Sequence, residues 1–214
     1  TLSFFLPKFP KQNKEKMLFN PITSSIAVIK QSKKLPKLDT VIQQISWFYF
    51  LATFLVTMMP AIVKNDFKQS EHMVSWIYAL FIVGVALGSM VYERLSKHEI
   101  NLSPMFSSMW LILLFLIVSG VVLPFSASMP FFILALIVLF VLALVLGVFS
   151  TPLYALLQRL PPKEWQSQAV ASNNIANAIY MIGASILQII LYHFNFSHAA
   201  MFYVLAFFWL LLLR

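Results

Sequence analysis

Long apolar runs, separated by short polar segments, fill the chain from residue 45 to its last residue. A helix needs about 20 mostly apolar residues to cross the hydrocarbon layer of a membrane. Five runs reach that length, and a sixth begins near Ala200 and is cut at Arg214. The five are residues 45–63, 73–92, 105–125, 131–157 and 169–192. The pattern predicts an all-α membrane protein with six transmembrane helices, the last of them truncated.

Strands of a transmembrane barrel do not fit these runs. Such strands are about 10 residues long and alternate between apolar and polar positions, whereas the runs are much longer and apolar throughout. The segments between the runs are short, and short connections join antiparallel neighbours. We therefore expect an up-and-down helical bundle over residues 45–214.

The first 44 residues have a different character. Residues 1–6 look like the end of an earlier helix, which Pro7 and Pro10 terminate because proline lacks the backbone donor that a helix needs. Residues 22–38 mix Ile and Leu with several Lys, which fits either a surface helix on the membrane or a solvated basic linker. We expect residues 1–44 to combine this helix end with a basic cytoplasmic loop.

Composition supports the membrane assignment. The chain is 60% apolar and 10% charged, whereas a soluble domain carries about 25% charged residues. Aromatic residues make up 15% of the chain, which excludes intrinsic disorder because disordered segments are poor in aromatics. The chain has no Cys, so disulfides and thiolate metal sites are excluded.

The net charge of +8 reports orientation rather than a polyanionic partner. All of the 15 basic residues except Lys64 and Lys68 fall on one side of the expected bundle. Cytoplasmic loops of membrane proteins carry such an excess of Lys and Arg. Residues 1–40 and the loops 93–104 and 158–168 should therefore be cytoplasmic. No nucleic-acid partner is expected, since the lysines are not interleaved with aromatics in a known module.

Sequence patterns of catalysis are missing from the chain. The four His stand near the ends of the apolar runs, and His98-Glu99 is followed by Leu102 where a zinc-binding helix would need a second His. The acidic residues lie outside the apolar runs, and we see no acid/base pair among them. We predict no enzymatic activity, no catalytic residue, no metal site and no cofactor.

Neutral polar residues form stripes on two of the expected helices. Residues three or four apart share one face of a helix. The stripe of the fifth run comprises Asn173, Asn177, Tyr180, Ala184 and Gln188, and that of the first run comprises Ser46, Tyr49, Thr53 and Thr57. Such faces should contact protein or a water-filled cavity rather than lipid. They either line a substrate path or form interhelical hydrogen bonds, worth about 0.6 kcal/mol each.

Small residues and prolines mark places of close packing or bending. Gly84 and Gly88 form a G-x-x-x-G pattern, which lets two helix backbones approach closely. Ala143, Gly147 and Thr151 form a ridge of small residues on the fourth run. We interpret both as packing features. Pro60 and Pro152 are expected to bend their helices near the ends of the first and fourth runs.

Two stretches resemble a known family. The first is Gly147-Val-Phe-Ser-Thr-Pro-Leu-Tyr-Ala-Leu-Leu-Gln158, followed by Ala169-Val-Ala-Ser-Asn-Asn-Ile-Ala-Asn-Ala-Ile-Tyr-Met181. They resemble the lysophospholipid transporter branch of the major facilitator superfamily, which reads G-x-F-x-V-P-L-Y/N-A-L-L-Q and then a run like A-x-N-N-x-x-N. Thr151 stands where that branch has Val. The second stretch, Gly88-Ser89 followed by Glu93-Arg94, resembles the cytoplasmic loop motif of the superfamily.

The resemblance implies helices seven to twelve of a twelve-helix transporter, which works by alternating access between two halves. Its partners would be the lipid bilayer, the missing N-terminal half and an amphiphilic small molecule. The branch moves lysophospholipid, mainly lysophosphatidylethanolamine, across the bacterial inner membrane. The residues expected to line the path or gate are Thr151, Tyr154, Gln158, Asn173, Asn177, Tyr180, Thr53 and Thr57; Gly88, Glu93 and Arg94 would form the cytoplasmic loop motif.

Two other functions remain open at this point. One is export of a drug or metabolite by a member of the same superfamily. The other is the membrane portion of a fused acyltransferase, although the H-x-x-x-x-D motif of such enzymes is missing around all four His.

Overall fold

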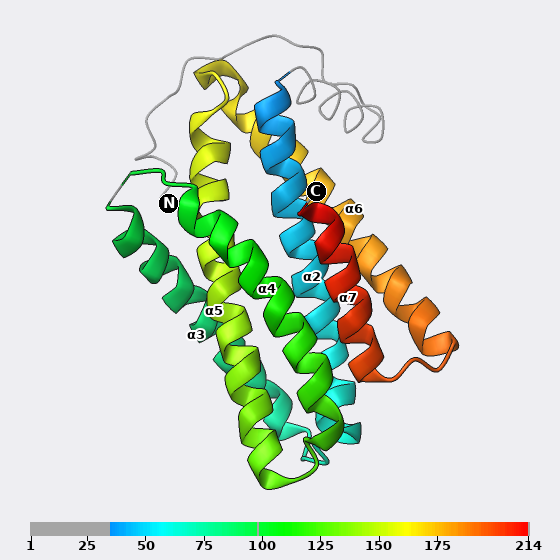
Figure 1. Ribbon diagram of the computed structural model, residues 1–214. Coiled ribbons are helices and arrows are strands. Elements are labelled where there is room, and N and C mark those ends of the chain that lie inside the picture. Colours follow the sequence, from blue (N-terminus) through cyan, green and yellow to red (C-terminus); the bar gives the residue numbers. More distant parts are fainter. Residues whose placement is uncertain (1–34, 98, 214) are drawn as a thin grey trace, which may run out of the picture.

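The computed structural model describes residues 35–97 and 99–213, and Figure 1 shows them as a bundle of helices. The α-helices are α2 (Pro36–Asn65), α3 (His72–Ser96), α4 (Ser103–Val122), α5 (Met129–Arg159), α6 (Gln166–His193) and α7 (His198–Leu212). The 3₁₀ turns η2 (Leu123–Phe125) and η3 (Lys163–Trp165) flank α5, and the described residues contain no strand. The helix end expected at residues 1–6, and most of segment 22–38, lie outside the described residues.

Five helices, α2 to α6, are long and apolar enough to cross a membrane, and α7 is a shorter apolar helix of 15 residues. This confirms the all-α membrane fold. The first helix is longer than its apolar run, because α2 begins at Pro36, inside the segment expected to be a loop. A proline in the first turn and the acidic Asp39 both favour a helix start there.

Successive helices alternate in direction, so their ends gather at two opposite ends of the bundle (Figure 1). The N-terminal end of α2 lies at the same end of the bundle as the C-terminal ends of α3 and α5. This end, hereafter the basic end, carries the described residues Lys37, Arg94, Lys97, Arg159 and Lys163. The other end, hereafter the opposite end, carries Lys64, Asp66, Lys68 and Glu71.

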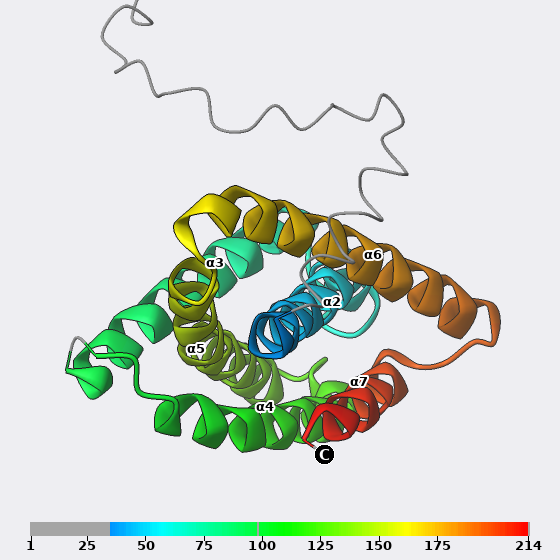
Figure 2. The same ribbon diagram turned by 90° about the horizontal axis from the view of Figure 1, so that it is seen from above.

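Two helices, α2 and α5, occupy the interior of the bundle, and the others surround them (Figure 2). α3 packs along α5, α6 packs along α2, and α4 lies between α5 and α7. The two inner helices supply much of the fully buried core, including Phe54, Met58, Leu142, Leu146 and Phe149. α3 and α6 therefore each pack mainly against one inner helix and leave many apolar side chains exposed on their other faces.

Glycines bring the backbones of α3 and α5 into direct contact. A Cβ atom added to Gly88 would lie 1.9 Å from the backbone oxygen of Leu144, and one added to Gly147 would lie 2.2 Å from the backbone oxygen of Val85. Neither position has room for any side chain. The G-x-x-x-G pattern of α3 thus faces the ridge of small residues on α5, which confirms the packing interpretation of both.

Candidate functional site

The two polar stripes face each other between α2 and α6, which run in parallel from the basic end. Ser46 Oγ donates a hydrogen bond to Asn177 Oδ1 at 3.0 Å, and the Thr57 hydroxyl donates to Gln188 Oε1. Both bonds join residues 131 positions apart, so the register between the helices holds over about three turns. This contact is hereafter the α2/α6 seam, defined by Ser46, Thr53, Thr57, Asn177 and Gln188.

Two tyrosines extend the polar contacts of α2. Tyr180 donates from its hydroxyl to Gln43 Oε1, which adds a further bond between α6 and α2. The Tyr154 hydroxyl of α5 donates to the hydroxyl of Tyr49 at 2.9 Å. The stripes thus meet protein rather than lipid, as expected, and interhelical hydrogen bonding accounts for most of their side chains. A role for these residues in a substrate path stays a prediction.

Asn173 differs from the other residues of its stripe. Its side chain is 2% exposed, and its Oδ1 atom has no hydrogen-bond partner among the described residues. Leaving a buried carbonyl unpaired costs about 1–3 kcal/mol. The Oε1 atom of Gln168, near the start of α6, is also buried and unpaired there. The basic-end part of α6 therefore presents two acceptors to which a donor would bind favourably.

The proline of α2 is accommodated by a neighbouring helix. Pro60 has no N–H to donate to the carbonyl of Val56 one turn earlier. The Tyr78 hydroxyl of α3 donates to that carbonyl oxygen at 2.9 Å. The break in the hydrogen bonds of α2 is thus filled from α3, a partner that the sequence pattern did not indicate.

A cavity of about 340 Å³ lies between α3 and α5 at the basic end. It is hereafter the α3/α5 pocket, and its polar lining comprises Ser89, Tyr92, Glu93, Ser96, Glu99, Thr151 and Arg159. The pocket brings together two residues that the sequence had assigned to different features, because Glu93 belongs to the loop motif and Thr151 to the expected gate. It also contains carboxylates and a guanidinium, so charges of both signs face one cavity.

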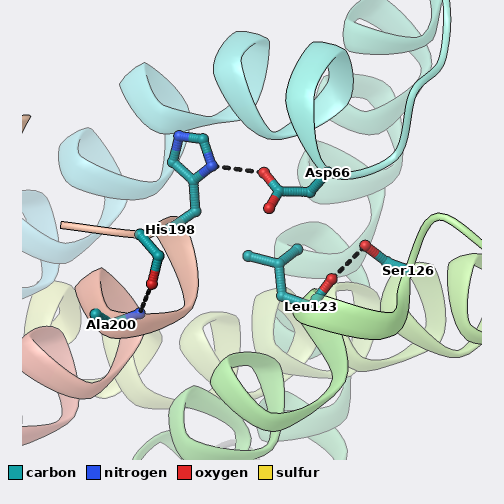
Figure 3. Close-up of polar contacts among 6 residues, drawn as sticks. Asp66, Leu123, Ser126, His198 and Ala200 are labelled. Carbon is teal, nitrogen blue, oxygen red and sulfur yellow. Dashed lines mark hydrogen bonds and ion pairs between the residues drawn. The ribbon is translucent and has the colours of Figure 1, made fainter. Parts of the chain in front are cut away.

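At the opposite end, a carboxylate and an imidazole join α2 to α7 (Figure 3). His198 Nδ1 lies 2.5 Å from Asp66 Oδ2, and the His198 ring also contacts the Tyr192 ring edge-on. His198 is 9% exposed. No sequence pattern indicated this contact, because Asp66 follows α2 and His198 begins α7, 132 positions later in the chain. At the same end Ser197 caps α7, because its Oγ accepts a hydrogen bond from the backbone N–H of Ala200 at 3.2 Å.

A comparison with protein families identifies the chain. The sequence model of the Major Facilitator Superfamily matches residues 45–213, which include all of α3 to α7 and most of α2. The chain belongs to the major facilitator superfamily. No curated protein and no solved structure matches it. Together with the apolar helices, the match makes the chain part of a multi-pass membrane transporter.

The residues expected to form the superfamily's loop motif lie in different surroundings. Gly88 is buried in the contact between α3 and α5. Glu93 and Arg94 lie exposed in the last turns of α3, and only Glu93 reaches the α3/α5 pocket. Arg94 stands at the C-terminal end of the helix, where a cation interacts favourably with the helix dipole.

The expected path residues of this transporter separate into two groups. Thr57, Asn177 and Tyr180 form hydrogen bonds between α2 and α6, Thr53 stands one turn before Thr57 on α2, and Asn173 stands one turn before Asn177 on α6. Thr151 lines the α3/α5 pocket, and Tyr154 contacts α2. Gln158 joins neither group, since its side chain is exposed and its backbone oxygen accepts from Gln166 Nε2 at 3.3 Å.

Several polar residues of the site were missed from the sequence. Gln43 stands three residues before Ser46 on the same helical face, but it precedes the apolar run and was counted as loop. The sequence indicates Arg159 only as a basic loop residue that sets orientation, and Glu99 only as part of an incomplete zinc motif. No sequence signal places them at one pocket, because that depends on how α3 packs on α5. Residues 35–97 and 99–213 contain no cluster of three or more His, Asp or Glu side chains that could bind a metal ion.

Proposed function

We propose that this chain is the C-terminal half of a transporter that moves a lysophospholipid, of the lysophosphatidylethanolamine type, across the bacterial inner membrane. The observation that carries the proposal is the α2/α6 seam with the unpaired carbonyl of Asn173 beside it. The seam is polar but uncharged, and it lies between two apolar helices, with Ser46, Asn177 and Gln188 buried and Thr57 exposed. This combination suits an amphiphile whose headgroup has no net charge and whose chain needs apolar walls.

The hydrogen bonds of the α2/α6 seam are weak enough to be exchanged when the helices move during transport. Neutral hydrogen bonds between membrane helices contribute about 0.6 kcal/mol each, so exchanging them for bonds to a headgroup costs little. Ion pairs in the same place would hold the helices far more strongly in apolar surroundings. In alternating access one six-helix half moves relative to the other, so hydrogen bonds along the path must break and re-form easily.

The orientation follows from the basic residues. The basic end of the bundle faces the cytoplasm, because Lys and Arg are retained on that side during insertion. The α3/α5 pocket then opens toward the cytoplasm, and the Asp66–His198 contact lies on the external side. Glu93 and Arg94 would take part in closing the cytoplasmic side.

The proposal is tested by uptake of labelled lysophosphatidylethanolamine into bacterial cells. Cells that produce the full-length protein should accumulate label several times faster than a deletion strain. Equal uptake in the two strains would overturn the lipid substrate. A panel of toxic compounds applied to the deletion strain then tests export of drugs or metabolites, the same-fold alternative.

A further inference from the structure

The α3/α5 pocket holds opposite charges that do not neutralise each other. Glu99 follows α3 and Arg159 is the last residue of α5, and both side chains are exposed and line the same cavity of about 340 Å³. Within the described residues neither of the two forms an ion pair or a side-chain hydrogen bond. A carboxylate and a guanidinium that face one cavity without touching match a ligand that itself carries both charges.

The hydroxyl groups of the pocket are arranged as acceptors. Ser89 Oγ donates to the backbone oxygen of Val85 at 3.1 Å, and Thr151 Oγ1 donates to that of Gly147 at 2.7 Å. A hydroxyl has one proton and two lone pairs. Because each hydroxyl can donate to its own helix, its lone pairs are left to accept from a group inside the pocket. A ligand with N–H groups satisfies these oxygens, whereas a methylated ammonium does not.

Apolar side chains complete the lining. Met90, Ile100 and Ala155 border the cavity beside the charged groups. The ligand's charged part therefore enters next to an apolar surface, as the head of an amphiphile does at the boundary of a membrane. The position agrees with that boundary, since the pocket lies at the helix ends rather than in the middle of the spans.

We propose that the α3/α5 pocket is a second headgroup site for the transported lipid, at the basic end and apart from the α2/α6 seam, and that it selects a primary ammonium joined to a phosphate. The ammonium lies against Glu99 and the oxygens of Ser89 and Thr151, while Arg159 holds the phosphate through paired N–H···O bonds. The inference rests on the proposed lysophospholipid substrate and adds a selectivity to it. Ethanolamine heads bind well, choline heads lack N–H donors, and glycerol heads lack the cation.

The test uses purified full-length protein in proteoliposomes, with initial rates of uptake for three substrates: lysophosphatidylethanolamine, lysophosphatidylcholine and lysophosphatidylglycerol. The wild type should show its lowest KM for the ethanolamine lipid. Thr151→Val removes an acceptor at nearly constant shape, so it should raise that KM about fivefold and leave the choline KM unchanged. Thr151→Ser, which keeps the hydroxyl, should restore the wild-type value.

The charged residues give separate readouts. Arg159→Gln should raise KM about tenfold for all three lipids because all carry the phosphate. Glu99→Gln should raise KM for the two lipids whose heads carry an ammonium group and leave KM for the glycerol lipid unchanged. Lys163→Gln and Glu164→Gln are matched controls, since both residues are exposed near the basic end and neither lines the pocket; their KM values should equal the wild type's.

Two results would overturn the inference, and they are distinguishable. Uptake of all three lipids by the wild type, with the same KM values in Thr151→Val, Glu99→Gln and Arg159→Gln, rejects the headgroup site and leaves the proposed substrate standing. No uptake of any of the three by the wild type rejects the proposed substrate and the site with it.

Discussion

At the scale of single residues, polar side chains inside the membrane pair with one another unless something else binds them. Asn177 and Gln188 have partners on α2, whereas the carbonyl of Asn173 has none among the described residues. The sequence predicted both stripes, because helical spacing places their residues on one face. It could not predict which members would pair, since pairing depends on the register between α2 and α6.

This difference separates two substitutions that look equivalent in the sequence. Asn173→Ala loses no protein bond at Oδ1, so it should slow lysophospholipid uptake and leave the Tm of the purified full-length protein unchanged. Asn177→Ala loses the bond from Ser46, about 0.6 kcal/mol, and should lower Tm slightly. Normal uptake by Asn173→Ala at normal membrane abundance would show that the residue serves packing alone.

The Asp66–His198 contact also belongs to this scale. His198→Ala should destabilise the protein by about 1–3 kcal/mol, because it leaves a largely buried carboxylate without its partner. His198→Gln keeps a donor and should lose less. His193→Ala is the matched control, as His193 is exposed at the same end of the bundle. The measurement is thermal unfolding of full-length protein in detergent, and equal Tm values for the His198 and His193 variants would contradict the role of the contact.

At the scale of helices, the sequence was most informative where apolar residues alone decide the structure. The apolar runs marked α2 to α6, and the small residues marked two packing faces. The start of α2 was missed because Lys37 and Asp39 are charged, although Pro36 and Asp39 are favourable at a helix start. The pairing of α3 with α5 was missed because a small-residue pattern does not name its partner.

The contact between α3 and α5 predicts a sharp contrast between glycines. Gly88→Ala should reduce the membrane abundance of the protein strongly, since an added Cβ would collide with the backbone of α5, and overpacking costs about 1–3 kcal/mol or more. Gly183→Ala should be tolerated, because an added Cβ there meets nothing within 4 Å. Abundance is measured by immunoblot of membranes, and equal loss in both variants would contradict the close contact.

The break in α2 allows a double-mutant test. Tyr78→Phe removes the donor that satisfies the Val56 carbonyl and should cost about 1 kcal/mol. In a Pro60→Ala background the helix supplies its own donor, so the same substitution should cost much less. The two effects on Tm should therefore be non-additive. An equal loss of Tm in the two backgrounds would show that Tyr78 does not replace the hydrogen bond that Pro60 cannot make.

At the scale of the whole molecule, the fold was predictable and the site only in part. Positive residues at one end and uninterrupted apolar runs determine a six-helix membrane half without any knowledge of packing. The α3/α5 pocket combines residues from the loop after α3 and from the end of α5, and such a combination is visible only after the helices have packed. The sequence therefore supplied Glu93 and Thr151 as candidates but not the neighbouring Glu99 and Arg159.

The most direct measurement reconstitutes purified full-length protein into liposomes and follows labelled lysophosphatidylethanolamine across the bilayer. Purification removes cellular enzymes, so movement of the lipid without conversion to a two-chain product separates transport from acyl transfer. We expect unmodified lysophosphatidylethanolamine to cross several times faster than in liposomes without protein. Crossing at the rate of empty liposomes, for a protein that is folded and correctly inserted, would contradict the lysophospholipid assignment.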